Sequence, residues 1–291
     1  MTKILVTGAN GQVGSELQSL ATQYPDFQLL FTDYKELDIT DKTAVLTFFQ
    51  EHQFQYCINC AAYTAVDKAE TEAKKAAEIN VTGSKNLAIA CQQKNAGLIQ
   101  LSTDYVYHNS QNTPFREDNS TNPQSVYART KLEGEQIAQT HNPLTTIVRT
   151  SWVYSSFGHN FVKTMIRLGK ERDQLNIIFD QIGTPTYARP LAKAILTIIQ
   201  KVGRGEVARE KLAGVYHYSN EGVTSWYDFA KAIFELKGIE VKVLPIETKD
   251  YLTAAVRPPF SVLNKGKIKA TFGIEIPHWR ESLKDCLKLL K

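Results

Sequence analysis

The sequence predicts an α/β fold: a doubly wound parallel sheet with a smaller lobe in the C-terminal half. Short apolar runs alternate with amphipathic stretches through the first half of the chain, as is typical of a parallel sheet covered by helices on both faces. A glycine-rich segment, Gly8 to Gly14, directly follows the first apolar run, where such folds make their first strand-to-helix turn. The length of 291 residues allows two domains, or one large α/β unit with a lobe.

The first half supplies the strands and helices of the expected sheet. Strands are predicted at 3–7, 27–32, 56–59, 98–102 and 145–149. Helices are predicted at 12–23, 41–52, about 74–94, and 125–140. Right-handed crossovers between successive parallel strands then produce the doubly wound arrangement.

After Thr150 the pattern loosens and prolines concentrate turns. Helical stretches remain at 161–170, 191–202 and 226–236, and strand-like pieces at 176–179, 215–218 and 241–244. We therefore expect residues 1–150 to form a dinucleotide-binding Rossmann domain. Residues 151–291 are expected to form mainly a substrate-binding lobe that returns one or two elements to the sheet.

Composition limits the possible partners. The 34 Lys and Arg residues exceed the 30 Asp and Glu residues by only four, too few to predict a nucleic-acid or membrane surface. No apolar run is long enough for a membrane span, and the N-terminus lacks the pattern of a signal peptide, so a cytoplasmic location is expected. Cys57 and Cys60 match a C-x-x-C spacing but lie in an apolar run without a second pair, so we expect buried thiols rather than a redox or metal site.

The glycine-rich segment predicts a site for the cofactor phosphates. Gly8 would allow the tight turn, Gly11 would let the backbone approach a pyrophosphate, and Gly14 would let the helix pack close to the strand. The free N–H groups and the dipole at the start of the helix favour phosphate there.

The adenosine end of the cofactor is expected near the second strand. Asp33 ends that strand, 19 residues after Gly14, and an acid at this place usually binds the ribose hydroxyls and favours NAD. A simple cap or turn role for Asp33 stays open. Asp38 and Ile39, in the following loop, are weaker candidates for holding the adenine.

Three residues predict carbonyl reduction. Tyr127 and Lys131 are four apart on one face of a predicted helix, where an ammonium beside the phenol would lower the tyrosine pKa. The phenol could then give a proton to a carbonyl oxygen. Thr103, at the end of the fourth strand, could polarise the same oxygen.

The glycine loop, Thr103 and the Tyr127/Lys131 pair resemble the extended short-chain dehydrogenases/reductases. Further segments are similar to one group among them, the dTDP-4-dehydrorhamnose reductases. These segments are 11–17, 59–70, 101–107, 126–135, 149–154 and 180–186, with Arg257, Pro258, Ser261 and Leu263 near the C-terminus. The resemblance spans nearly the whole chain.

The resemblance implies a role for further residues at matching positions. Gln12 and Val13 would contact the cofactor phosphates with Gly11, and Lys131 would also hold the nicotinamide ribose. Ala61, Ala62 and Tyr63 would line the cofactor after the third strand. Asp104 and Trp152 would contact a sugar-nucleotide, although a core tryptophan is the plainer interpretation of Trp152. Arg257 is a candidate for the substrate pyrophosphate, because its forked guanidinium suits phosphate oxygens, although an ordinary surface arginine stays open.

The resemblance also implies the reaction: NADH- or NADPH-dependent reduction of the C4 ketone of dTDP-4-dehydro-β-L-rhamnose. Asp33 would repel a 2′-phosphate, yet Lys35 lies two residues away and could offset it, so both cofactors stay open. Two alternatives also stay open. One is another nucleotide-sugar reductase or epimerase on the same scaffold, and the other is a non-catalytic regulatory subunit similar to that of methionine adenosyltransferase.

One departure from the family concerns metal. The resemblance implies that some members form metal-bridged dimers. Glutamates hold the metal there, including one near the first helix and one after a Pro-Thr pair. Glu16 fits the first position, but Arg189 occupies the second, and a cation cannot ligate Mg²⁺. We therefore predict no metal, and either a monomer or a homodimer without a metal bridge.

Overall fold

A six-stranded parallel sheet forms the centre of the molecule. The computed structural model describes residues 1–290 of the chain. The strand order is β10-β5-β4-β3-β1-β2, and each neighbouring pair is parallel. The strands are β1 (Thr2–Thr7), β2 (Phe27–Thr32), β3 (Tyr56–Asn59), β4 (Gly97–Thr103), β5 (Thr145–Thr150) and β10 (Gly214–His217). The strand order reverses beside β1, as in a Rossmann sheet, and the predicted fold class is confirmed.

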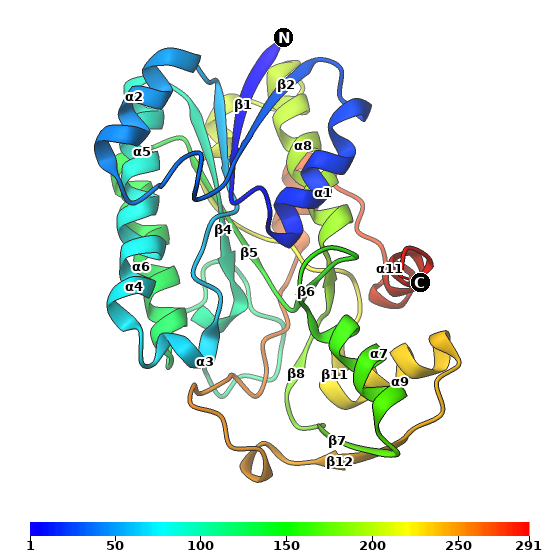
Figure 1. The fold of residues 1–291 in the computed structure, drawn as a ribbon. Helices are drawn as coiled ribbons and strands as arrows, with labels where there is room; N and C mark the ends of the chain where they lie inside the picture. Colours follow the sequence, from blue (N-terminus) through cyan, green and yellow to red (C-terminus); the bar gives the residue numbers. More distant parts are fainter. Residues whose placement is uncertain (291) are drawn as a thin grey trace.

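Helices cover both faces of the sheet, because successive side chains of a strand point to opposite sides. In β1, Ile4 and Val6 pack against one apolar cluster and Leu5 against another. The first face carries α1 (Gln12–Leu20) and α8 (Ala188–Gly203), and the second carries α2 (Lys42–His52), α5 (Ser84–Gln93) and α6 (Val126–His141) (Figure 1). The N-terminal strand is therefore buried from both sides.

The helix predicted at 74–94 is divided into three parts. It consists of α4 (Ala73–Ala77), a π-helical segment (Glu78–Gly83) and α5. Within the π-helical segment, Asn80 donates to Thr130 Oγ1 of α6 at 3.0 Å and accepts the Tyr63 N–H at 2.9 Å. An apolar pattern does not reveal these contacts, since the Asn80 side chain bonds to residues 17 and 50 positions away in the sequence.

The C-terminal half builds a second core of its own. This core joins α7 (Phe161–Glu171), α9 (Trp226–Lys237) and α11 (Trp279–Lys288) with the parallel pair β7 (Gln174–Ile178) and β12 (Lys242–Ile246). Shorter pairs are β6 (Val153–Tyr154) with β9 (Thr186–Tyr187), and β8 (Ile182–Gly183) with β11 (Thr224–Ser225). Among the described residues of this half, only β10 returns to the central sheet.

Three helices lie where no helix was predicted: α3 (Val66–Ala69), α10 (Gly266–Phe272) and α11. The first two are four and seven residues long, too short to show a helical period in sequence. No helix of residues 1–290 has both the length and the apolar character needed to cross a membrane.

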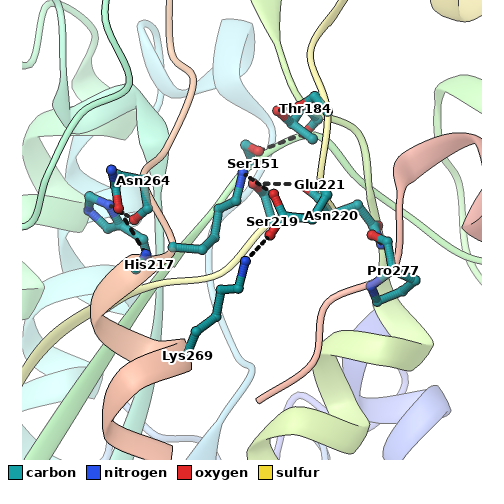
Figure 2. A network of polar contacts seen from close by, with 12 residues as sticks. Ser151, Thr184, His217, Ser219, Asn220, Glu221, Asn264, Lys269 and Pro277 are labelled. Atoms are coloured by element: carbon teal, nitrogen blue, oxygen red, sulfur yellow. Dashed lines mark hydrogen bonds and ion pairs between the residues drawn. The ribbon is translucent and has the colours of Figure 1, made fainter. Parts of the chain in front are cut away.

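Polar contacts tie the C-terminal segments to the ends of β5 and β10 (Figure 2). Ser151, directly after β5, donates to the Thr184 carbonyl at 2.7 Å. Asn220, shortly after β10, donates to the Pro277 carbonyl at 3.0 Å, and its side-chain oxygen accepts the Tyr187 N–H at 2.8 Å. The chain that follows β5 is therefore held in a fixed position at the carboxyl edge of the sheet.

Candidate active site

A cavity of about 780 Å³ opens at the carboxyl ends of the strands, between the sheet and the C-terminal half. Most of the residues predicted for the site line it. These are Gly8, Gly11, Gln12, Val13, Asp33, Asp38, Ile39, Ala61, Ala62, Thr103, Asp104, Tyr127, Lys131 and Trp152. Ligands of open α/β sheets bind in this position.

Three of the predicted residues lie outside the cavity lining. Gly14 is behind the loop, where a Cβ would lie 2.5 Å from the Gly8 carbonyl oxygen, so it serves helix packing. The buried Tyr63 turns its hydroxyl to Glu72 at 2.9 Å. The guanidinium of Arg257 is paired with the Asp67 carboxylate.

The glycine loop fits a pyrophosphate. Gly8 has φ +63°, and a Cβ there would lie 2.5 Å from the Ala61 nitrogen, so both backbone conformation and space require glycine. Helix α1 begins after Gly11 without a side-chain cap. Its first-turn N–H groups therefore remain available to an anion at the cavity wall.

Asp33 directly follows β2, as predicted, and its carboxylate contacts the glycine loop. Its carboxylate accepts the Asn10 N–H at 2.9 Å and the Tyr34 N–H at 2.8 Å. These bonds hold the carboxylate against the phosphate loop while it still lines the cavity. The Asp38 carboxylate is occupied differently, because it accepts both the N–H and the hydroxyl of Thr40.

The three residues predicted to be catalytic are positioned by β4 and α6. Thr103 ends β4, and its hydroxyl donates to Asp104 Oδ1 at 3.2 Å while accepting the Tyr105 N–H at 3.1 Å. Tyr127 and Lys131 lie in the first two turns of α6. The Lys131 ammonium donates to the Leu101 carbonyl at 2.7 Å, which orients the buried side chain toward the strand end.

The predicted lowering of the Tyr127 pKa is wrong for this structure. Burial raises the pKa of Tyr127 to about 12, and the hydrogen bond to Thr103 offsets only part of that rise. Burial also lowers the pKa of Lys131 to about 8, against the opposing field of Glu135. The reason is that burial disfavours both the Tyr127 phenolate and the Lys131 ammonium. The ammonium also donates to the Leu101 carbonyl rather than to the phenol.

A buried polar network behind Lys131 had no sequence signal. Arg149 of β5 binds the Glu135 carboxylate of α6 with a contact of 2.6 Å, and donates to the Tyr107 hydroxyl at 2.6 Å. That hydroxyl lies 2.8 Å from His217 Nε2, and burial lowers the pKa of His217 to about 3, so the imidazole is neutral. The network fixes α6, and with it Tyr127 and Lys131, against the sheet.

Three polar side chains with unpaired atoms face the cavity. Ser102 Oγ, Thr150 Oγ1 and Asp104 Oδ2 are buried and have no hydrogen-bond partner within residues 1–290, and all three residues line the cavity. Burial raises the pKa of Asp104 to about 7. Sequence reasoning missed Ser102 and Thr150, although their places at the ends of β4 and β5 were the available signal.

An aromatic pair forms one wall of the cavity. Trp152 and Trp226 both line it, and their rings stack with centroids 3.6 Å apart and planes at 9°. Trp152 has φ +46°, a left-handed conformation that costs a non-glycine residue about 1–2 kcal/mol. Such strain tends to mark functional positions. Trp226 was not predicted, because 74 residues separate the two tryptophans in the sequence.

Arg257, which is partly buried, bridges the two halves of the chain. Its guanidinium makes two contacts with the Asp67 carboxylate of α3, at 3.0 and 2.6 Å. The Ala255 N–H donates to the same carboxylate at 3.1 Å. The Arg257 guanidinium, which was expected to bind a pyrophosphate, is therefore paired with the Asp67 carboxylate in this structure.

Glu16 and Arg189, the two residues compared with the metal-bridged dimers, contact each other. The fully buried Glu16 carboxylate lies 3.2 Å from Arg189 Nη1 and accepts the Ser155 hydroxyl at 2.6 Å. Within residues 1–290, no three His, Cys, Asp or Glu side chains are grouped as a metal site requires. Arg189 thus supplies the positive charge beside this carboxylate.

The cysteines follow the prediction only in part. Cys57, Cys91 and Cys286 are buried free thiols. Cys60 is partly exposed and lines the cavity, so the prediction of burial is wrong for this residue. It follows β3 directly, where the chain leaves the core at the edge of the sheet.

Comparison with known proteins shows the family to which the chain belongs. The family model described as RmlD substrate binding domain matches residues 1–291. The chain belongs to this family. Among curated members of the RmlD family, the dTDP-4-dehydrorhamnose reductase of Aggregatibacter actinomycetemcomitans is 40% identical over 292 residues, which cover 98% of each chain.

Solved structures of RmlD relatives have the same fold over their full length. A dTDP-4-dehydrorhamnose reductase from Clostridium acetobutylicum is 45% identical, with a TM-score of 0.93 and coverage of 99% of both chains. A second, from Bacillus anthracis and solved in complex with NADP, is 38% identical, with a TM-score of 0.92 and the same coverage.

Proposed function

We propose that this protein is an NADH- or NADPH-dependent reductase that converts the C4 ketone of dTDP-4-dehydro-β-L-rhamnose to the alcohol of dTDP-β-L-rhamnose. The observation that carries the proposal is the meeting of Thr103, Tyr127 and Lys131 at the wall of a cavity that also contains a phosphate-binding glycine loop. The relatives named as dTDP-4-dehydrorhamnose reductases support the choice of substrate.

The cofactor would lie along the carboxyl edge of the sheet. The N–H groups at the start of α1 would bind its pyrophosphate, and Asp33 its adenosine ribose. Ala61 and Ala62 would line it after β3, and Lys131 would hold the nicotinamide ribose. When bound, the dihydronicotinamide supplies a hydride for C4.

Tyr127 would supply the proton that completes the reduction. Its raised pKa keeps the proton on the phenol at neutral pH, the form that an acid needs. Negative charge grows on O4 as the hydride arrives, and this oxygen then takes the proton from Tyr127. The Thr103 hydroxyl would hydrogen-bond the same oxygen, and a charged Lys131 would stabilise the phenolate that remains.

The sugar-nucleotide would bind between the sheet and the C-terminal half. Asp104 and Trp152 would contact the sugar, and Arg257 would exchange Asp67 for the diphosphate. We further propose the division expected from the sequence: residues 1–150 hold the cofactor, and residues 151–291 mainly hold the sugar-nucleotide. The separate apolar core of the second half supports this division.

The test is oxidation of NADH and of NADPH by the purified protein with dTDP-4-dehydrorhamnose made in situ. We expect turnover in the wild type, and a fall in kcat of about 10²- to 10⁴-fold in Tyr127→Phe, because the proton donor is lost. Cofactor binding, measured by fluorescence titration, should persist.

Tyr24→Phe is the matched control, since it removes a phenolic hydroxyl outside the cavity lining and keeps the ring that stacks on Phe27. It should keep wild-type kcat. Wild-type turnover by Tyr127→Phe would contradict the assigned proton donor, and a wild type that oxidises neither cofactor with this ketosugar would contradict the reaction.

A further inference from the structure

The stacked tryptophans are held by two short strands that pair with each other. In the antiparallel pair β8 and β11, Gly183 lies opposite Thr224, and Ile182 lies opposite Ser225. Trp226 directly follows β11, so this pairing fixes the distance between Gly183 and the Trp226 backbone. Trp152 arrives from the end of β5, more than 70 residues away from Trp226 in the sequence.

The Trp152 indole is wedged between its neighbours. A Cβ on Gly183 would lie 2.6 Å from Cε2 and 2.9 Å from Nε1 of this ring, so the glycine backbone itself contacts the indole. Trp226 stacks on the ring with planes at 9°. The left-handed backbone of Trp152 therefore belongs to a residue whose ring is in contact on its edge and on its face.

Trp226 is in turn braced from behind. The Phe161 ring of α7 lies 4.6 Å from the Trp226 ring at 53°, and the Phe229 ring lies 6.4 Å away at 45°. Phe229 is fully buried in the core of the C-terminal half. The stack therefore connects a rigid core to the wall of the cavity.

We propose that Trp226 is a positioning residue for the sugar-nucleotide: by stacking on Trp152, it holds that indole in the one orientation that binds the sugar. Gly183 contributes from the edge of the ring, because any larger residue would displace the indole. The inference rests on the proposed function, since it assumes that Trp152 contacts the sugar. It adds a residue that acts through Trp152 and that sets KM for the sugar-nucleotide rather than the chemical step.

The first experiment separates KM from kcat. In Trp226→Leu the Trp152 indole loses its stacking partner, so KM for the ketosugar should rise about three- to tenfold, the equivalent of one aromatic pair. KM for the cofactor should stay within about twofold, because the phosphate loop and Asp33 lie on other elements. Trp226→Phe keeps an aromatic face and should restore most of the affinity.

The second experiment tests whether Trp226 acts through Trp152. Trp152→Leu should raise KM for the ketosugar, and Trp152→Leu/Trp226→Leu should raise it no further, because the second change acts only through the first. Multiplied effects in the double variant would overturn the inference, as would a Trp226→Leu variant whose KM for the ketosugar equals that of the wild type.

Near-ultraviolet circular dichroism provides a readout of the stack itself. The chain has three tryptophans, and two indoles with centroids 3.6 Å apart should give a coupled signal. It should disappear in Trp226→Leu and persist in Trp279→Phe, a matched control in the core of the C-terminal half. A coupled signal that survives in Trp226→Leu would overturn the inference.

Folding and the proposed function are controlled separately. If Trp226→Leu does not fold, Gly183→Ala tests the same indole from its edge and should also raise KM for the ketosugar, whereas a wild-type KM there would count against the inference. Absence of turnover in the wild type contradicts the proposed function. Turnover with a KM for the ketosugar that is indifferent to Trp226 and Gly183 contradicts only this inference.

Discussion

The cofactor side and the sugar side of the cavity are built in different ways. On the proposed cofactor side, the Gly8–Gly14 loop and the ends of neighbouring strands would supply the phosphate and ribose contacts, and all of these segments belong to the first half of the chain. The sugar side brings together residues far apart in the chain, such as Trp152 with Trp226 and Asp67 with Arg257. The glycine loop of the first depends on backbone conformation. The second depends on side-chain pairs whose members are far apart in the chain and meet only in the folded structure.

This difference has a physical origin. A phosphate-binding turn is a local structure, and glycines at set spacings suffice to specify it. A wall made of a stacked pair or an ion pair needs two partners, and each partner has an ordinary sequence context. Substitutions in the glycine loop should therefore act by changing the backbone conformation. Substitutions on the sugar side should act by removing one partner of a side-chain pair.

The largest effect is expected from Gly8→Ala. The added Cβ would lie 2.5 Å from the Ala61 nitrogen at φ +63°, so the loop must shift. We expect a loss of unfolding free energy of at least about 2 kcal/mol, measured by urea denaturation. The Kd for NADPH should rise about a hundredfold, measured by titration.

Gly238→Ala is the control for Gly8→Ala. Its φ is +61°, and a Cβ there meets no atom of residues 1–290 within 4 Å. It should cost only about 1 kcal/mol of stability, since it carries the left-handed strain alone. Equal effects of the two substitutions would show that the close contact with Ala61 is unimportant.

The second prediction concerns Asp104, whose pKa burial raises to about 7. The folded state holds this proton more tightly than the unfolded chain, whose carboxyl titrates near 4. The contribution of Asp104 to stability is therefore fully present below about pH 4 and is lost as the pH rises through about 7. From pH 4 to 8 the stability of Asp104→Asn should rise by about 2–4 kcal/mol relative to the wild type.

Urea denaturation at several pH values measures this difference. Asp250→Asn, which changes an exposed carboxylate, should show no comparable trend. A wild type and Asp104→Asn with parallel pH profiles would contradict the shifted pKa of Asp104.

The third prediction concerns the pair that joins the two halves. If Arg257 exchanges Asp67 for the substrate diphosphate, Arg257→Ala should raise KM for the sugar-nucleotide about tenfold, since hydrogen bonds to charged groups are worth about 1.5–3 kcal/mol. Asp67→Asn frees the guanidinium and should lower that KM about two- to threefold.

Initial rates with varied sugar-nucleotide measure both constants. Arg257→Lys keeps the charge but lacks the forked guanidinium, so its KM for the sugar-nucleotide should lie between those of the wild type and Arg257→Ala. An increase in KM with Asp67→Asn would mean that the pair itself orders the site.

The smallest effect is expected from removing divalent metal. Arg189 already supplies a cation beside the buried Glu16, so treatment with EDTA should leave both the kcat and the sedimentation coefficient unchanged. Loss of either, restored by added Mg²⁺, would contradict the prediction that no metal is bound.

Much of the central fold could be predicted from the sequence. The predicted strands lie within one or two residues of β1 to β5, because buried parallel strands are short continuous apolar runs that end at turn residues. The helix predicted at 74–94 was only partly right, since a π-helical segment (Glu78–Gly83) divides it. The short helices α3 and α10 gave no usable signal.

The sequence by itself determined the parallel sheet, the glycine loop and the Tyr127/Lys131 pair, because each depends on spacing along one segment. Only the tertiary structure decided how Trp226 stacks on Trp152, how Asp67 engages Arg257, and that the pKa of Tyr127 is raised rather than lowered. These depend on burial and on contacts between distant segments, which exist only once the chain has closed around its two cores.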